Sequence, residues 1–225
     1  MLIILFTHLR IHAFTHFLTI DTMKKIHILF LVMLLGPVAS FAQGIPDSEH
    51  DYLITLDTDY GEIKMVLFDE TPIHKMNFVE LAKAGVYDHI KFHRVIDNFM
   101  IQTGDYKTRN KPGDYDPGII QKNLPAEIRP QYKHIYGAVG AARRDNPQKA
   151  SSGSQFYIIE NPKGAPHLDG EYTVFGRVVS GFRVIHRIAD VPVDDKDHPK
   201  KEIRMTVRVD TVKRSQIEKF YNPDY

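Results

Sequence analysis

Alternating apolar and polar residues mark the first regular part of the chain. From Tyr52 to Phe68, apolar side chains recur at about every second position on both sides of Asp59-Tyr60-Gly61, where a glycine permits a tight turn. This pattern predicts a β-hairpin. Thr71-Pro72 then favours a helix start, and apolar residues recur at helical spacing as far as Gly85, a typical helix stop.

Shorter apolar segments follow and predict further strands. A second short helix is expected at 182–188, whereas 105–130 is rich in Gly, Pro, Asn and charge and predicts a long irregular connection. Many short strands with two helices favour a mainly β fold, a closed β-barrel capped at its ends. The expected strands lie within residues 92–102, 137–142, 155–159, 172–179 and 203–209.

The segment before this barrel has a different pattern. Lys24 and Lys25 precede an apolar run from Ile26 to Leu35, and small residues follow up to Ala42, which is the pattern of a secretory signal peptide. The apolar run is shorter than the roughly 20 residues that span a bilayer. We therefore expect cleavage after Ala42, no stable membrane insertion, and a mature protein that is periplasmic or secreted.

The domain organisation follows from these segments. Residues 1–22 are expected to be an over-extended start, unstructured or not translated, because export signals normally begin at the N-terminus. Residues 23–42 are the expected signal peptide, and 43–213 are expected to form one domain, given roughly 150 residues per domain. Residues 214–225 are expected to be a C-terminal tail.

Composition and charge narrow the classes of partner. Lysine and arginine together number 29 against 28 aspartate and glutamate residues, with no long block of like charge. Nucleic acid is therefore not expected as a partner, because its recognition needs a basic surface. The chain has no cysteine, which excludes disulfides and a lipid-modified cysteine anchor.

One stretch, FHRVIDNFMIQTGD at residues 92–105, mixes residue types that suit neither a core nor a surface. Arg94 would be costly in a core unless paired, and Phe99 and Met100 would be out of place on a surface. A concave site with an apolar floor and a few fixed hydrogen-bond donors accommodates both kinds of residue, including the amide of Gln102.

From about Leu53 to Val212 the order of motifs resembles the cyclophilin family of peptidyl-prolyl cis/trans isomerases. The matching segments are GEIKMVLFDETPIHKMNFVELAKAGVYD, FHRVIDNFMIQTGD, SSGSQFYI and HLDGEYTVFGRVVSG. The resemblance implies an eight-stranded antiparallel barrel with a helix at each end, isomerase activity without a cofactor, and proline-containing polypeptides as partners. A monomer is expected.

The resemblance also implies the site residues. Arg94 and Gln102 are the expected catalytic residues, and no metal is expected. The expected substrate-binding residues are Phe99, Met100, Ala142, Arg143, Gln155, Tyr157, His167, Leu168 and Tyr172.

The chemistry of the reaction fits these residue types. Amide resonance gives an Xaa-Pro bond a rotational barrier of about 18 to 20 kcal/mol, and no bond is broken during isomerisation. A guanidinium that donates toward the prolyl nitrogen, the expected role of Arg94, favours the twisted transition state. Gln102 would bind the substrate backbone, the apolar residues would hold the proline ring, and Ala142 and Arg143 would offer main-chain groups.

Several positions depart from the family pattern. His167 stands where many cyclophilins have tryptophan, so we expect weak cyclosporin binding. Tyr157 and Tyr172 replace a frequent phenylalanine and a frequent histidine, and both keep an aromatic body. Arg143 often corresponds to asparagine, and together with Arg144 it predicts a preference for acidic substrates.

Other functions remain possible from the residues alone. The first alternative is a binding module or chaperone that holds proline-containing segments with little turnover, although a pure binder has no need of Arg94. His89 and His93 are spaced like metal ligands, but they lack the glutamate of the zinc-hydrolase motif and favour a structural interpretation. The serine-rich stretch 151–154 has no partner motif for nucleophilic catalysis and favours a loop.

Overall fold

The computed structural model of the chain describes residues 49–109, 117–120 and 123–218, and the structural statements below concern these residues. The expected start segment and signal peptide lie outside the described residues. So do the end of the expected tail and part of the 105–130 connection.

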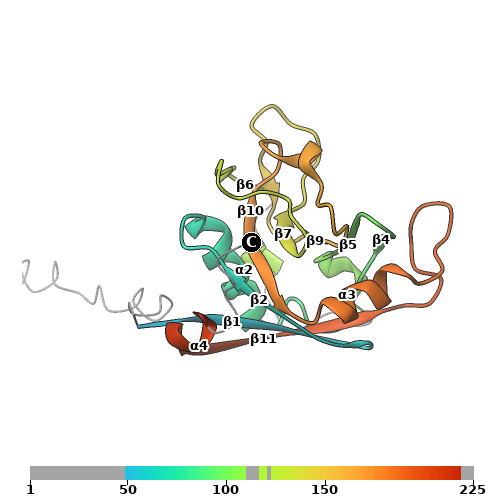
Figure 1. Cartoon of the computed structure of the whole chain (residues 1–225), viewed down its shortest axis with the longest axis horizontal. Helices are drawn as coiled ribbons and strands as arrows, with labels where there is room; N and C mark the ends of the chain where they lie inside the picture. The colour runs from blue at the N-terminus through green and yellow to red at the C-terminus, as the bar shows by residue number, and fades with distance from the viewer. Residues whose placement is uncertain (1–48, 110–116, 121–122, 219–225) are drawn as a thin grey trace, which may run out of the picture. The chain divides into compact units, whose positions relative to one another are not determined.

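The described residues form a mainly antiparallel β structure. The strands are β1 His50–Thr58, β2 Gly61–Leu67, β3 Ile90–Lys91, β4 Arg94–Ile96, β5 Met100–Thr103, β6 Asn123–Leu124, β7 Ala138–Ala141, β8 Ser151–Ser152, β9 Phe156–Ile159, β10 Val174–Ser180 and β11 Arg204–Lys213. One sheet has the order β3-β11-β1-β2-β10-β7-β9-β5-β4, and β6 pairs with β8. In Figure 1, β1, β2 and β11 run along the lower side, and β7, β9, β5 and β4 lie above them.

The main sheet closes on itself where its two edge strands meet in the sequence. β3 and β4 are the edges of the sheet, yet only Phe92 and His93 separate them in the chain. The Phe92 N–H donates to the carbonyl of Ile203 beside β11 (2.9 Å), and the His93 N–H donates to the carbonyl of Gln102 in β5 (3.1 Å). With 90–96 counted as one strand, the sheet is the predicted eight-stranded antiparallel barrel. The predicted fold class is confirmed.

The hairpin predicted from the first alternating segment is present. Thr58 pairs with Gly61, so β1 and β2 are joined by the two residues between them. Gly61 has φ +119°, a conformation that favours glycine, which explains why the turn carries this residue. The hairpin lies at the centre of one wall of the barrel, between β11 and β10.

Helix α2 Pro72–Lys83 packs against β10 and β11, and a distant residue caps it. Thr71 is the N-cap residue as predicted, but its side chain makes no capping hydrogen bond. The buried carboxylate of Glu127 accepts hydrogen bonds from the N–H groups of Ile73 (3.1 Å) and His74 (2.9 Å) instead. The free donors at the start of the helix are thus satisfied by the segment that precedes β7.

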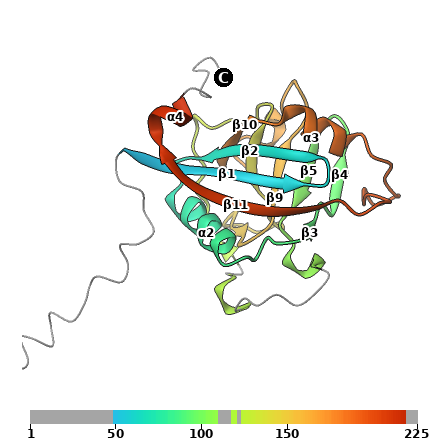
Figure 2. The same ribbon diagram turned by 90° about the horizontal axis from the view of Figure 1, so that it is seen from below.

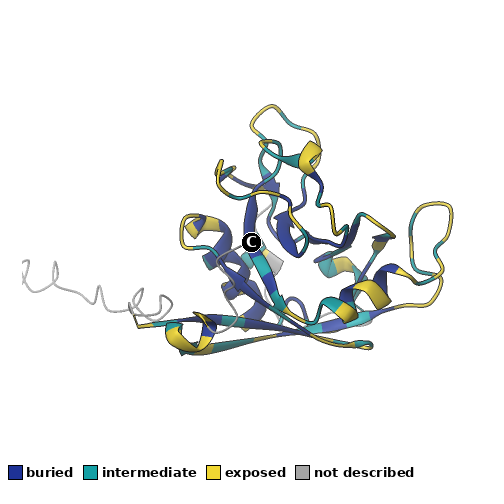
Figure 3. Cartoon of the chain, in the orientation of Figure 1, coloured by how far each residue is buried: buried dark blue, intermediate teal, exposed yellow. Residues whose placement is uncertain are grey.

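The interior of the barrel is closed by aromatic side chains beneath α2. Phe78 of α2 stacks on Tyr87 with ring centroids 5.0 Å apart and meets the edge of Phe156 in β9 at 5.2 Å. All three rings are buried. Figure 3 shows this pattern for the whole fold, with buried residues concentrated in the strands and in the inner face of α2, and exposed residues in the connections.

Helix α3 Phe182–Ala189 packs against the barrel on the other side. Figure 2 shows α2 and α3 on opposite sides of β1 and β2. The predicted glycine before the helix, Gly181, is its N-cap with φ +94°, and an added Cβ there would lie 2.8 Å from the Cα of Ile63. The helix buries Ile185 and Ile188 against the barrel. Both predicted helices are therefore present at the expected places.

The segment expected to be a C-terminal tail begins as a short helix, α4 Arg214–Glu218. Its Ile217 is buried. Arg214 lies 3.1 Å from a carboxylate oxygen of Asp51 and 3.0 Å from one of Asp69. Packing and ion pairs thus stabilise residues 214–218. No local pattern in the sequence predicts this short helix.

Candidate active site

Four neighbouring strands place the candidate residues in one row on the outer face of the barrel. Arg94 of β4 is the pairing partner of Gln102 of β5, Gln102 is that of Tyr157 of β9, and Tyr157 is that of Gly140 of β7. Directly paired residues of antiparallel strands lie on the same face of a sheet. The sequence order of motifs thus becomes a lateral row of side chains.

The residues that alternate with this row face the core. Val95, Ile101, Ile158 and Val139 are paired across the same four strands, and each has 0% of its surface exposed. Because side chains alternate between the two faces of a strand, burial of this apolar row fixes the polar row outside. The mixed stretch 92–105 is therefore neither core nor plain surface, and the arginine lies on the outer face.

A groove of about 1110 Å³ lies along the polar end of this row. Its lining includes five of the predicted site residues, which are Arg94, Gln102, Ala142, Arg143 and Gln155. The amide of Gln102 donates to the side-chain oxygen of Gln155 (3.3 Å), so the two amides are held side by side. Four of these residues, all except Ala142, carry polar side chains.

The apolar part of the site adjoins the groove. Met100 is buried, and Phe99 lies in the β4–β5 turn next to it, where Asn98 has φ +56°. The short helix η4 Pro166–Leu168 brings the exposed His167 beside Phe99, with ring centroids 5.6 Å apart. One apolar cluster contains Met100, Ala142, Tyr157, Phe99, Leu168 and Tyr172. The structure thus brings all eleven predicted residues to the groove or to its apolar neighbour.

Arg94 is held at one nitrogen and free at the other two. Its Nε donates to Oδ2 of Asp197 at 3.2 Å, and 44% of the arginine side chain is exposed. Within the described residues, Nη1 and Nη2 have no hydrogen-bond partner. Two donors of a permanent cation are thereby available to a ligand in the groove.

The main-chain groups expected to bind substrate are only partly free. The Ala142 N–H donates to the carbonyl of Gln155 (3.0 Å), and the Ala142 carbonyl accepts from the N–H of Ser152 (2.7 Å). Ala142 therefore has no free N–H, and its carbonyl keeps only one of its two lone pairs. In the described part of the chain, neither the N–H nor the carbonyl of Arg143 has a hydrogen-bond partner, so Arg143 can supply the main-chain contact.

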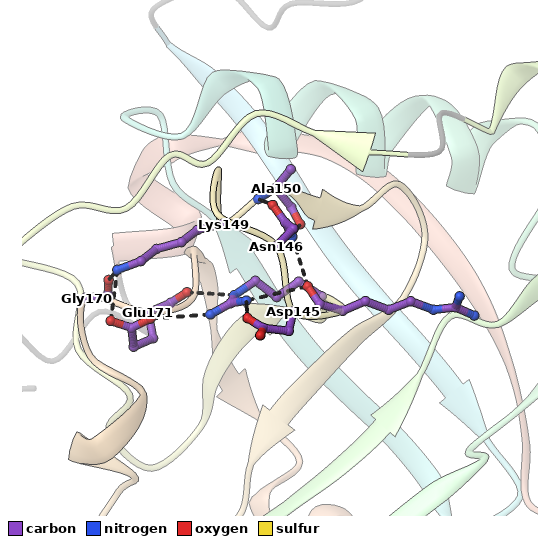
Figure 4. Close-up of polar contacts among 8 residues, drawn as sticks. Asp145, Asn146, Lys149, Ala150, Gly170 and Glu171 are labelled. Carbon is purple, nitrogen blue, oxygen red and sulfur yellow. Dashed lines mark hydrogen bonds and ion pairs between the residues drawn. The ribbon is translucent and has the colours of Figure 1, made fainter.

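The Arg143 side chain does not point freely into the groove. Its Nε and Nη2 donate to the carbonyl (3.0 Å) and the carboxylate (3.3 Å) of Glu171, and its guanidinium lies 4.6 Å from the ring centroid of Tyr172. Lys149 also donates to Glu171 (2.8 Å) and to the carbonyl of Gly170 (2.8 Å), and Figure 4 shows the Lys149 side chain extending to these two residues. The Lys149 hydrogen bond is the main reason that the pKa of Glu171 lies below its ordinary value. Of the two adjacent arginines, only Arg144 is exposed and unpaired among the described residues, and it lines the groove.

A buried hydrogen-bonded chain that the sequence analysis missed supports the pocket. The His134 Nδ1–H donates to Oδ1 of Asp169 (2.9 Å), because an ionised carboxylate can only accept. The other ring nitrogen, Nε2, then accepts from the hydroxyl of Tyr157 (2.9 Å). These two hydrogen bonds therefore fix the ring of Tyr157, which lies opposite Gly140.

The pKa values of His134, Tyr157 and Asp169 agree with these hydrogen bonds. Burial lowers the pKa of His134 from its ordinary value of 6.5, so the ring is neutral near pH 7. Burial raises the pKa of Tyr157 and keeps its proton in place. Burial alone would raise the pKa of Asp169, but the hydrogen bonds from the N–H and ring of His134 outweigh it and hold that pKa below 3.8.

The described residues contain neither a metal-binding cluster nor a membrane-spanning helix. Among residues 49–109, 117–120 and 123–218, no three histidine, aspartate or glutamate side chains are placed to hold a metal ion. In the same part of the chain, no helix has the length and apolar character needed to cross a bilayer.

The comparison with known proteins decides the family. The family model described as cyclophilin type peptidyl-prolyl cis-trans isomerase/CLD matches residues 53–209. The chain belongs to the cyclophilin family. This cyclophilin is therefore a peptidyl-prolyl cis-trans isomerase, as the resemblance of the motifs predicted.

Individual relatives give the same result. The chain is 41% identical over 167 residues to a peptidyl-prolyl cis-trans isomerase-like 2 of Rhizopus delemar, and this match spans 74% of the chain but only 28% of that relative. It is 37% identical to a peptidyl-prolyl cis-trans isomerase-like 1 of Aspergillus fumigatus, over 68% of the chain and 91% of the relative. A solved cyclophilin-type isomerase of Cryptosporidium parvum, in the presence of the dipeptide Ala-Pro, is 30% identical with a TM-score of 0.60, covering 72% of this chain and 98% of its own.

Proposed function

We propose that this isomerase turns Xaa-Pro bonds by the action of Arg94 in the groove, and that its substrates are proteins in the course of export. No bond is broken in the reaction, so catalysis requires a donor that is fixed where charge develops. As the bond twists, the lone pair of the prolyl nitrogen localises and becomes a better acceptor. The free Nη groups of Arg94 are the donors suited to it.

The apolar cluster suits the proline ring. Phe99, Met100, Tyr157 and Leu168 lie together, and Tyr157 is held in place by His134. A small apolar ring that fills such a pocket gains binding energy from the area it buries. With the ring fixed there and the preceding residue bound to the main chain of Arg143, the bond between them is where the substrate can twist. The related Cryptosporidium protein, solved with Ala-Pro, supports a proline-containing ligand.

The observation that carries the role of Arg94 is its position beside Gln102 with two donors unpaired. The test compares Arg94→Ala and Arg94→Lys with Arg208→Ala, which removes an exposed arginine whose partners Glu62 and Asp210 lie outside the groove. We expect kcat/KM to fall about 100-fold or more in Arg94→Ala, on the scale of a lost transition-state donor, and Arg208→Ala to keep wild-type activity. Full activity of Arg94→Ala in a folded protein would refute the role.

A binding module with little turnover is the competing function. It would keep the apolar cluster and bind proline peptides as well as the isomerase does. The two functions separate in one titration, because only an isomerase speeds exchange between the cis and trans peptide at substoichiometric concentration.

Action on exported proteins rests on the sequence of the N-terminal segment. The pattern from Lys24 to Ala42 supports cleavage and export, and the barrel that follows contains the groove. Expression of the full chain in a Gram-negative host, followed by fractionation and N-terminal sequencing, tests this. We expect a periplasmic product that begins at Gln43. A product that keeps Met23 and stays in the cytoplasm would contradict the proposal.

A preference for acidic substrates depends on Arg144 alone. Arg143 is already paired with Glu171, so of these two adjacent arginines only Arg144 has an unpaired guanidinium among the described residues, and it lines the groove. An exposed ion pair is worth about 0.2 to 1 kcal/mol, which corresponds to at most about fivefold in kcat/KM. We expect Arg144→Ala to remove a preference for Glu over Lys before proline, and Arg143→Ala to act through loss of packing. Equal rates on Glu-Pro and Lys-Pro peptides in the wild type would refute the preference.

The cyclosporin prediction keeps its basis in His167. This residue lies exposed beside Phe99 at the edge of the apolar cluster, and an imidazole offers less apolar surface than an indole. Isothermal titration of wild type and His167→Trp tests the idea. We expect the variant to bind cyclosporin more tightly, and tight binding by the wild type would contradict the prediction.

A further inference from the structure

The connection between α3 and β11 brings a carboxylate to the guanidinium of Arg94. Oδ2 of Asp197 accepts from Nε of Arg94 at 3.2 Å. Arg94 lines the groove, and Asp197 is absent from its lining. The carboxylate of this contact thus lies outside the lining of the groove. The contact uses the one guanidinium nitrogen that leaves both terminal nitrogens unpaired.

We propose that Asp197 is a positioning residue for Arg94, which holds the guanidinium at Nε so that Nη1 and Nη2 stay directed to the substrate. This inference rests on the proposed role of Arg94. It assigns Asp197 no contact with the substrate. The effect is orientation, because a carboxylate reduces the net charge of the pair and adds no positive potential.

The turn that carries Asp197 is built to hold its shape. The Asp194 carboxylate accepts from the N–H groups of Lys196 and His198, each at 2.9 Å, and from the His198 ring at 3.1 Å. These hydrogen bonds, the one from the His198 N–H first, lower the pKa of Asp194 to about 2. The Asp197 N–H also donates to the Asp194 carbonyl (3.1 Å). Such side-chain hydrogen bonds to the following backbone define a rigid turn.

This turn is fastened to the strand that carries Arg94. The N–H of Val95, the next residue of β4, donates to the carbonyl of Asp197 at 2.9 Å. Asp197 therefore contacts adjacent residues of β4, with its carbonyl on Val95 and its carboxylate on Arg94. It does so with φ +64°, a left-handed conformation that is uncommon outside glycine and that clusters at functional sites.

We expect the contact between Arg94 and Asp197 to affect the catalytic rate more than the folding free energy. The side chains of Arg94 and Asp197 are 44% and 38% exposed, and exposed ion pairs contribute little to folding. A long arginine side chain has many rotamers, and a donor that must meet a developing lone pair works only in a few of them. A rigid turn that binds Nε selects those rotamers before substrate arrives. The opposite effect, in which Asp197 competes with the substrate for Arg94, predicts the opposite result below.

The experiment compares Asp197→Ala with a matched control in the same turn. Asp195 is exposed and makes no hydrogen bond or ion pair within the described residues, so Asp195→Asn removes the same charge without the contact. We expect Asp197→Ala to lower kcat about tenfold with little change in KM, which is the kind of loss that misplacement of a catalytic group causes. Asp197→Asn keeps an acceptor oxygen and should lose less, and Asp195→Asn should match the wild type.

A second background separates positioning from a general structural role. In Arg94→Lys there is no Nε to hold, so Asp197→Ala should cause no further loss there. An equal loss in both backgrounds, unchanged activity, or higher activity of Asp197→Ala would each overturn the inference. Full activity of Arg94→Lys and Arg94→Ala would instead refute the role of Arg94 itself, and the inference with it.

A spectroscopic measurement reads the contact directly. In the wild type, the Nε–Hε signal of Arg94 in a ¹H–¹⁵N spectrum should be shifted and protected from exchange with water. Asp197→Ala should move it to the position of a free arginine, and Asp195→Asn should leave it unchanged. A wild-type signal already at the free position would overturn the inference.

Discussion

Gly140→Ala tests whether the Tyr157 ring forms the floor of the proline pocket. A Cβ built at Gly140 would lie 2.5 Å from Cε2 of Tyr157 and closer still to Cζ and Oη. Ordinary contact begins at 3.4 Å, so the ring would have to retreat by roughly 1 Å. Gly140 does not need a positive φ, so the substitution acts by this clash and not by backbone strain.

The size of the effect follows from that displacement. Overpacking a dense region costs about 1 to 3 kcal/mol of unfolding free energy, and a shift of about 1 Å near a reacting group can cost up to 100-fold in rate. We therefore expect Gly140→Ala to fold, to melt at a lower temperature, and to lose between about tenfold and 100-fold in kcat/KM.

A double-mutant cycle with Tyr157→Ala decides the cause. Tyr157→Ala removes the ring and has low activity of its own, but Gly140→Ala should then cause almost no further loss of stability or rate, because the clash has gone. The rates come from cis/trans exchange of a proline peptide followed by NMR, and the stabilities from circular dichroism, since the chain has no tryptophan. Wild-type activity in Gly140→Ala, or additive losses in the double variant, would refute the reasoning.

Three further predictions concern the groups that hold the site in place. Glu127→Ala leaves the first free N–H groups of α2 without an acceptor and should lower the unfolding free energy by about 2 to 3 kcal/mol, measured by denaturant titration. The control is Glu80→Ala, which changes an exposed residue of α2, and an equal loss in both variants would contradict the prediction. Tyr157→Phe leaves Nε2 of His134 buried without a donor and should lower the unfolding free energy by about 1 to 3 kcal/mol. Its kcat/KM should stay within about threefold of the wild type because the ring remains. A large loss of rate with no loss of stability would be inconsistent with a structural role of the hydroxyl. Burial lowers the pKa of His74 and of His134 below 6.5, so the unfolded chain binds more protons than the folded one as the pH falls through this range. The unfolding free energy should therefore fall between pH 7 and pH 5.5. A constant unfolding free energy over this range would contradict the prediction.

Much of the fold is visible in local patterns. The hairpin, the start of α2 at Pro72 and the glycine before α3 were all predictable, because each depends on a few neighbouring residues. The motif order then implied the closed barrel and the candidate site. The inward row that includes Val95 and Ile101 explains why: the same alternation that buries one face fixes which residues reach the other.

What the sequence did not reveal depends on contacts between distant segments. Glu127 caps α2 from 53 positions beyond His74 in the sequence. Asp197 reaches Arg94 across 103 positions, from a stretch that reads as a solvated mixed-charge loop. The pairing of the Arg143 side chain was not visible in the sequence, because Glu171, directly before Tyr172, lies on another loop and its approach to Arg143 depends on the fold. Asp169 and Glu171 both lie within the motif segment HLDGEY, but the sequence alone does not show which side chains they bind.

The most direct test of the central claim is the exchange rate between the cis and trans forms of an Ala-Pro peptide, measured by NMR with the chain from Gln43 onward at a small fraction of the peptide concentration. The peptide alone exchanges in tens to hundreds of seconds. We predict strong acceleration that saturates with peptide and that Arg94→Ala largely loses while it stays folded. Binding of the peptide without faster exchange would contradict the account and identify the groove as a binding site only.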